Sequence, residues 1–107
     1  MAIVFARIDN RLIHGQVVEG WLPATKVSEV VVVSSSASAS SLMKKMLRMS
    51  LPSSYGLNIL DHGAAAEYLK EHEKEEIFLI LEDFVSLSFL VENGVKIESV
   101  NIGNTKY

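Results

Sequence analysis

The chain has 107 residues, of which 49% are apolar and 21% are charged, and its formal net charge is −3. This length and composition fit one small domain with a real apolar core and exclude a disordered chain. The weak negative charge argues against a protein held to nucleic acid or to an anionic membrane by a basic field. The absence of cysteine excludes disulfides, thiolate metal sites and cysteine nucleophiles, and it fits a reducing cytosol.

The sequence shows no targeting segment. Residues 1–5 are apolar but lack the basic start, long apolar middle and cleavage site of a signal peptide. No apolar run approaches the roughly 20 residues of a membrane-spanning helix. We therefore expect a soluble, intracellular protein.

The first half of the chain alternates between apolar strands and helical spacing. Residues 2–6 predict a first strand, and a polar loop follows it. Glu29–Val33 contains four consecutive valines, which is typical of a strand buried on both faces of a sheet. Between these strands, four apolar residues at helical spacing predict a helix that Pro23 closes: Val17, Val18, Trp21 and Leu22.

The second half continues the alternation. The serine-rich residues 34–41 predict a loop and a helix start rather than a flexible linker, since a buried strand precedes them and an apolar helix follows. That helix is expected to turn its apolar residues to the core: Leu42, Met43, Met46, Leu47 and Met49. Further helices are predicted after Asp61 and over residues 84–91. Three further strands are predicted over residues 57–60, 77–81 and 95–102.

The order βαβαβαβαβ predicts an α/β fold, with a doubly wound, mainly parallel sheet and helices on both faces, in a single domain. Ligands of such sheets bind beyond the carboxyl ends of the strands, where the strand order reverses. A central first strand would place the loop over residues 8–14 at that crevice. The loop also opens a helix, so the free N–H groups of Gly15, Gln16 and Val17 are expected to bind an anion.

His14 is the candidate nucleophile of this loop. A neutral imidazole can attack phosphorus, and the helix amides can then hold the phosphoryl group. Arg11 offers a permanent positive charge and a forked donor for phosphoryl oxygens. Asp9 is expected to orient Arg11 or the imidazole rather than to contact phosphate, because two anions repel. Ser35 is a further candidate phosphate contact, although helix capping is the more frequent role of such a serine.

Neither a metal nor a cofactor is expected. Glu82 and Asp83 follow a strand near the same crevice, but further metal ligands are not evident beside them, and helix capping is favoured. His62 and His72 lack the spacing of metal ligands and are expected to face water.

The string RIDNRLIHGQV at residues 7–17, with Trp21 one helical turn further, resembles the N-terminal signature of the enzyme IIB subunits of the mannose/sorbose family of the sugar phosphotransferase system. The resemblance continues at VVVV (residues 30–33), GVKI (94–97) and VNIG (100–103), so it spans essentially the whole chain.

The resemblance implies that His14 takes a phosphoryl group from a phosphohistidine on a IIA partner and that Arg11 neutralises the phosphate. His14 would then pass the group to a sugar imported by the membrane IIC/IID subunits. A subunit with this activity would be cytoplasmic and peripherally associated with the permease. Nucleic acid is not an expected partner.

The sequence departs from the family in two places. Members normally continue well beyond the segment at residues 101–103, so residues 1–107 would form a IIB domain that lacks the family's C-terminal portion. The loop after the second strand often carries an acidic residue where this chain has Ser35. An uncovered last strand would pair with another chain, so we expect self-association through residues 95–102.

Two other functions remain open from the residues. A signalling receiver phosphorylated on aspartate fits the length and the alternation, with Asp9, Asp61 and Lys106 after strands one, three and five. However, only one acidic residue follows the first strand, and no Ser or Thr follows the fourth. The other alternative is a shortened, non-catalytic copy that binds IIA or another partner.

Overall fold

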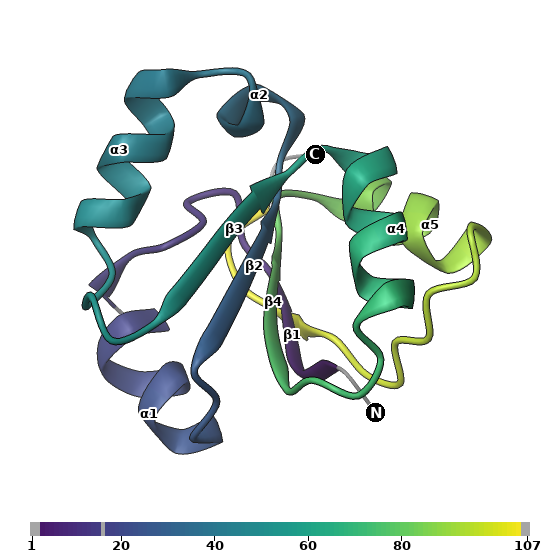
Figure 1. The fold of residues 1–107 in the computed structure, drawn as a ribbon, viewed down its shortest axis with the longest axis horizontal. Helices are drawn as coiled ribbons and strands as arrows, with labels where there is room; N and C mark the ends of the chain where they lie inside the picture. Colours follow the sequence, from purple (N-terminus) through teal and green to yellow (C-terminus); the bar gives the residue numbers. More distant parts are fainter. Residues whose placement is uncertain (1–2, 16, 106–107) are drawn as a thin grey trace.

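The computed structural model describes residues 3–15 and 17–105. Its centre is a parallel sheet of five strands in the order β3-β2-β4-β1-β5 (Figure 1). Every strand pair in the sheet is parallel. The strands are β1 (Ile3–Ile8), β2 (Glu29–Val33), β3 (Gly56–Leu60), β4 (Ile77–Leu81) and β5 (Asn101–Ile102).

Helices cover both faces of this sheet, so the predicted doubly wound α/β fold is confirmed (Figure 1). One face carries the π-helical turn η1 (Val17–Trp21), which runs directly into α1 (Leu22–Thr25), and then α2 (Ser35–Ser38) and α3 (Ser41–Met49). The other face carries α4 (His62–Glu71) and α5 (Phe84–Glu92).

The valine run of β2 divides between two apolar cores, as a strand buried on both faces must. Val30 and Val32 pack in the core under α1, α2 and α3, whereas Val31 and Val33 pack in the core under α4 and α5. All four are fully buried, and each buried aliphatic side chain of this size contributes about 1.5–3 kcal/mol. These side chains therefore hold the two helical layers to the sheet.

Side-chain caps place the helix starts at the carboxyl ends of the strands. Ser34 follows β2 and accepts a hydrogen bond from the Ala37 N–H. Asp61 caps α4, and Asp83 caps α5 by accepting from the Ser86 N–H. The capping role predicted for Asp83 is confirmed, and substitution of such a cap by alanine usually costs about 1 kcal/mol.

Three predicted strands have different bounds in the structure, and the third differs only by beginning one residue earlier, at Gly56. The first strand runs to Ile8 rather than ending at residue 6, because Arg7 and Ile8 pair with β4 on one side and β5 on the other. The last strand was expected over residues 95–102 and contains only Asn101–Ile102. The apolar residues before it belong to the core under α4 and α5 instead of a sheet ladder: Val95, Ile97 and Val100.

The prediction for α3 was wrong in its inner face. Leu42, Met46 and Met49 are 68%, 58% and 86% exposed, and Met43 is 36% exposed. Among the predicted residues Leu47 is buried as expected, and Leu51, just beyond the end of the helix, is buried with it. The helix has apolar residues on two sides, so spacing alone did not determine which side meets the sheet.

The two histidines expected to face water are both half-buried. His62 shares a hydrogen bond of 2.9 Å between its Nε2 atom and the Ser86 hydroxyl. His72 stacks on the Tyr68 ring with the ring centroids 3.9 Å apart. Both side chains therefore serve packing roles that their sequence positions did not indicate.

Candidate functional site

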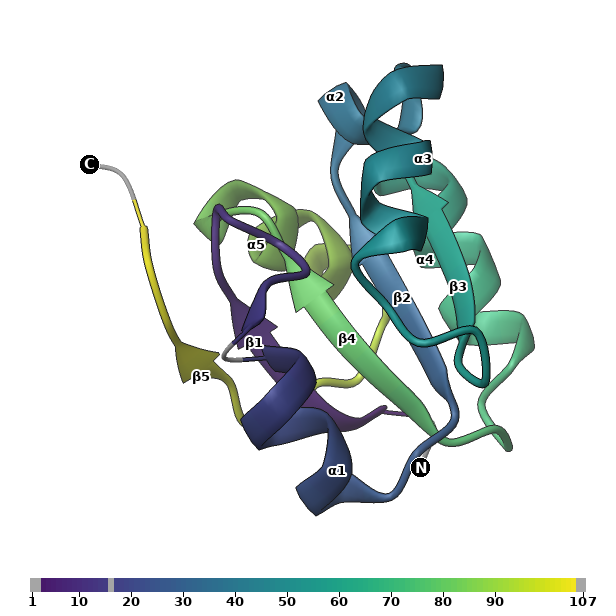
Figure 2. The same cartoon turned by 90° about the vertical axis from the view of Figure 1, so that its left-hand side faces the viewer.

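The loop after β1 lies at the point where the chain leaves the sheet in opposite directions. From β1 the chain passes to the face of α1, and from the neighbouring β4 it passes to the face of α5. Figure 2 shows the loop beyond the carboxyl ends of these two strands. The Asp9 N–H donates to the Leu81 carbonyl at 2.8 Å, which ties the loop to β4. This is the crevice position expected for a ligand site in an open parallel sheet.

Asp9 is the centre of the loop. Its carboxylate is completely buried. Arg11 donates to it three times: the backbone N–H and Nε to Oδ1 at 3.0 Å each, and Nη2 to Oδ2 at 2.9 Å. Oδ2 also lies 2.9 Å from His14 Nε2. The predicted set Asp9, Arg11 and His14 is therefore one connected group of side chains.

The electrostatics of this group favour an ionised Asp9. Burial of the carboxylate alone would favour its neutral form. Hydrogen bonds from the Arg11 side chain and backbone, together with His14, outweigh that burial and hold the pKa of Asp9 well below its usual range. The carboxylate in turn raises the pKa of the Arg11 guanidinium.

His14 is held in one orientation by this contact. An ionised carboxylate can only accept hydrogen bonds, so the proton shared with Asp9 belongs to Nε2 and the ring lone pair is on Nδ1. Among residues 3–15 and 17–105, no hydrogen bond to Nδ1 is formed. The side chain is 17% exposed, so the ring is fixed but not sealed from solvent.

The backbone between Arg11 and His14 is unusual at Leu12. Leu12 has a φ of 60°, in the left-handed region that most side chains avoid. Its N–H donates to the Asp9 carbonyl at 3.0 Å, and its side chain is buried in the core under α1. Burial of Leu12 thus offsets the strain and turns the chain so that the next residues reach back over Asp9.

The three residues predicted to bind an anion differ in their surroundings. The Val18 N–H donates to the His14 carbonyl at 3.0 Å, so the His14 backbone is joined to the first turn of η1. A Cβ atom at Gly15 would meet no atom within 4 Å apart from its chain neighbours, so there is open space beside this glycine. Val17 has a fully buried side chain and begins η1. Gln16, the remaining member of this prediction, lies outside the described residues.

Ser35 is not part of this group in the described structure. It is exposed at the start of α2, and none of the hydrogen bonds of the described residues joins it to Asp9, Arg11 or His14. The serines on either side of it, Ser34 and Ser36, instead donate to Glu82 Oε1 at 3.0 Å and 3.3 Å.

Three residues that were not predicted as site residues surround Asp9 and its partners: Arg7, Asn101 and Gly103. Arg7 Nε lies 3.3 Å from Asp9 Oδ2, and Arg7 Nη1 donates to the Asn101 side chain. A Cβ atom at Gly103 would fall 2.5 Å from both Arg7 Nη2 and Asp9 Oδ2. The available signal was an arginine inside an otherwise apolar strand, which needs a buried anionic partner.

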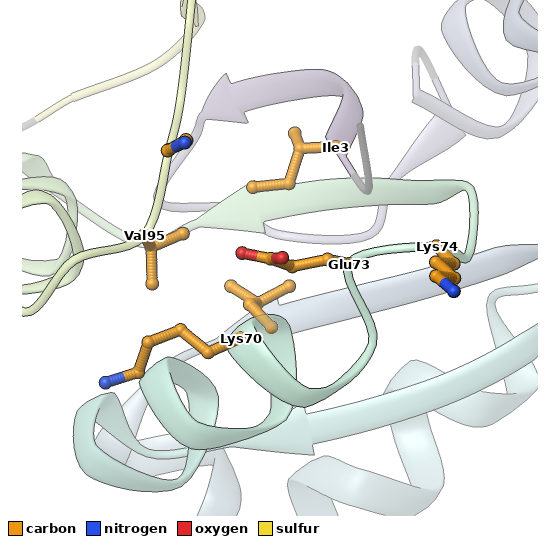
Figure 3. Close-up of a pocket in the computed structure, with 7 residues that line it drawn as sticks. Ile3, Lys70, Glu73, Lys74 and Val95 are labelled. Carbon is orange, nitrogen blue, oxygen red and sulfur yellow. The ribbon is translucent and has the colours of Figure 1, made fainter.

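A pocket of about 290 Å³ lies elsewhere, around Ile3 at the amino end of β1. In Figure 3 the Glu73 carboxylate reaches toward Ile3 and Val95, whereas Lys74 lies to the side. His14 follows the opposite end of β1, so this pocket is separate from the loop.

Two other features are absent from the described part of the chain. No group of three or more His, Asp or Glu residues within it could hold a metal ion. No helix within it is long and apolar enough to cross a membrane.

Comparison with known proteins gives consistent matches along the chain. Residues 3–107 match the family model described as the PTS system sorbose subfamily IIB component, where PTS is the phosphotransferase system. The mannose-specific EIIAB component of Escherichia coli K12 is 35% identical over the whole chain, which covers 34% of that protein. The sorbose-specific EIIB component of Lacticaseibacillus casei is 31% identical over the whole chain, which covers 66% of that protein.

Solved structures give the same result. The IIBSor domain of the sorbose permease from Klebsiella pneumoniae superimposes with a TM-score of 0.90 at 26% identity, over all of this chain and 67% of that one. The chain thus spans about two thirds of the length of the IIB proteins it matches, and about a third of the EIIAB protein.

Proposed function

Because this chain belongs to the sorbose subfamily of phosphotransferase-system IIB components, we propose that it is a phosphoryl carrier in sugar uptake whose acceptor is His14. The phosphoryl group would come from a phosphohistidine on a IIA protein. It would go to a sugar at the membrane IIC/IID subunits, with this chain on their cytoplasmic side.

The observation that carries the proposal is the contact between His14 Nε2 and Asp9 Oδ2 at 2.9 Å. This contact keeps the proton on Nε2 and presents Nδ1 as the nucleophile. When Nδ1 attacks phosphorus, a bond from Nδ1 to phosphorus forms and the donor's nitrogen–phosphorus bond breaks, with its electron pair returning to the donor imidazole. The His14 ring becomes more positive, and the ionised Asp9 beside it stabilises that charge.

Arg11 and the start of the helix would receive the phosphoryl group. The Arg11 side chain is 47% exposed, so its guanidinium is accessible to an incoming anion. The N–H groups of Gly15, Gln16 and Val17 at the helix start would add neutral donors and the positive end of the helix dipole. The open space beside Gly15 leaves room for the tetrahedral group.

In the second step, a sugar hydroxyl attacks the same phosphorus from the side opposite Nδ1. The bond from Nδ1 to phosphorus breaks, its electron pair returns to the ring, and the hydroxyl proton is released. His14 is thereby restored to the neutral form that began the cycle. The protein contributes position and charge rather than covalent chemistry beyond the histidine, as in phosphoryl transfer generally.

Phosphoryl transfer from a phosphorylated IIA protein tests the first step. We expect the wild-type chain to acquire a phosphate that is stable in base and lost in acid, and we expect His14→Ala to acquire none. His72→Ala is the matched control, because this histidine lies at the end of α4 and contacts Tyr68 rather than the loop. Label that persists in His14→Ala would refute the assignment.

The chemical stability of the phosphate separates the receiver from this proposal, and a second assay separates the non-catalytic copy. A receiver would carry an acyl phosphate, which is lost in base, on an aspartate. The carboxylate of Asp9 is already enclosed by Arg11, Arg7 and His14, which disfavours that chemistry. A non-catalytic copy would accept phosphate but fail to deliver it, and a sugar-phosphorylation assay with the membrane subunits would reveal this.

A further inference from the structure

Arg7 is a buried cation next to the proposed acceptor. Its side chain is only 6% exposed, although it lies at the end of an apolar strand. It is held on three sides: Nε by Asp9 Oδ2, Nη1 by the Asn101 side chain of β5, and the guanidinium face by the Trp21 ring, 5.5 Å away. Movement away from these partners would leave a buried charge without compensation, which is costly, so the guanidinium stays in this position.

Arg11 is placed quite differently. Its side chain is half-exposed, yet in this structure it donates to both oxygens of Asp9. If Arg11 turns to the phosphoryl group, at least part of this double contact with Asp9 has to be given up. Asp9 would then be a buried carboxylate with fewer donors, next to a phosphoryl group of the same sign.

We propose that Arg7 is a positioning residue that keeps Asp9 and its contact with His14 in place while Arg11 moves from Asp9 to the phosphoryl group. The inference rests on the proposed function, because it concerns the phosphorylated state of His14. The two arginines thus have separate tasks: Arg7 is a fixed partner of Asp9, and Arg11 is an exchangeable one.

The end of β5 determines the position of Arg7. Asn101 pairs with Arg7 in the sheet and also accepts from its side chain. Two residues on, the Gly103 N–H donates to the Ile8 carbonyl at 2.7 Å, and the missing side chain leaves the space that Arg7 and Asp9 occupy. The segment at residues 101–103 therefore contributes to the site through Arg7.

The test compares Arg7→Gln with Arg7→Lys in both phosphorylation states, after circular dichroism and thermal melting confirm folding. In unphosphorylated Arg7→Gln we expect the ¹⁵N shifts of His14 to show the proton still on Nε2, because Arg11 still holds Asp9. In the phosphorylated form we expect the phosphohistidine half-life to fall roughly tenfold, since a hydrogen bond to a charged group has been lost. Arg7→Lys should recover part of this loss.

If Arg7 only maintained the fold, Arg7→Gln would alter the unphosphorylated and the phosphorylated protein to the same extent. Changes in the His14 ¹⁵N shifts, relative to wild type, that are equal in the two forms would therefore overturn the proposal. A folded Arg7→Gln with a wild-type half-life would also overturn it. If Arg7→Gln does not fold, Asn101→Ala decides, because it removes one anchor of Arg7 and leaves the charge. We expect a half-life about threefold shorter, and an unchanged one refutes the proposal. Failure of the proposed function is distinct: wild-type His14 would then take no phosphate at all.

Discussion

The Oδ2 atom of Asp9 lies 2.9 Å from Nε2 of His14, and the same oxygen accepts from Nη2 of Arg11 at 2.9 Å. One carboxylate oxygen thus connects the proposed nucleophile to the cation expected to meet its phosphate. On the proposed function, the ionisation state of Asp9 would determine both which ring nitrogen of His14 reacts and where Arg11 is held.

Asp9→Asn is expected to slow phosphoryl acceptance by about a hundredfold or more. An asparagine amide is neutral and cannot stabilise the positive charge that grows on the ring, and its NH₂ group can favour the wrong tautomer. Single-turnover transfer from a phosphorylated IIA protein measures the rate, and ¹⁵N shifts of His14 report the tautomer. A wild-type rate in this variant would show that the Asp9 contact is not used.

The low pKa of Asp9 predicts how stability depends on pH. A carboxyl whose pKa is lower in the folded than in the unfolded chain stabilises the fold above its unfolded value, ordinarily 3.8, and this contribution is lost as the pH falls through the folded value. The free energy of unfolding should therefore decline from about pH 5 downward, and this group should add no pH dependence near neutrality. Denaturant titrations at several pH values measure this, and Asp9→Asn should decline less steeply.

Arg11→Gln is expected to impair phosphoryl acceptance far more than folding. Removal of the guanidinium takes two hydrogen bonds from the buried Asp9 carboxylate, so the melting temperature should fall, although Arg7 and His14 still contact Asp9. The phosphoryl group would in addition lose its charged donor, so the rate should fall more. Arg11→Lys should recover part of the rate, because it keeps the charge but loses the fork. A variant that is fully folded at the assay temperature and accepts phosphate at the wild-type rate would instead indicate that Arg11 mainly maintains the fold.

The parts of the site that are local in sequence were predictable. Asp9, Arg11 and His14 lie within six residues of one another after an apolar strand, so strand order and helix start sufficed to bring them to the crevice. The contact from Arg7 to Asn101 joins residues 94 positions apart, and no local pattern contains it. The prediction of the inner face of α3 was wrong for a related reason. The helix has two apolar sides, and only packing against the sheet determines which of them is buried.

Among the described residues β5 is an edge strand of the sheet, so self-association of this chain stays a prediction, over a shorter segment than expected. β5 lies at the end of the strand order, and Ile102 is 58% exposed. Unpaired backbone groups at such an edge can pair with a second chain. Light scattering at high concentration should show species heavier than one chain, and Ile102→Lys should reduce them. A strictly monomeric mass at every concentration would contradict this prediction.

Gly103→Ala should disturb the site although it changes no polar group. The added methyl carbon would lie 2.5 Å from Arg7 Nη2 and Asp9 Oδ2, well inside van der Waals contact, so both side chains must shift. We expect a loss of about 1–3 kcal/mol in the free energy of unfolding and a slower phosphoryl acceptance. Gly20→Ala is the matched control, because a methyl group there meets no atom within 4 Å and η1 should tolerate it. The two variants could instead show the same free energy of unfolding and the same rate of phosphoryl acceptance. The segment at residues 101–103 would then shift without moving Asp9, and the contribution of β5 to the site would be refuted.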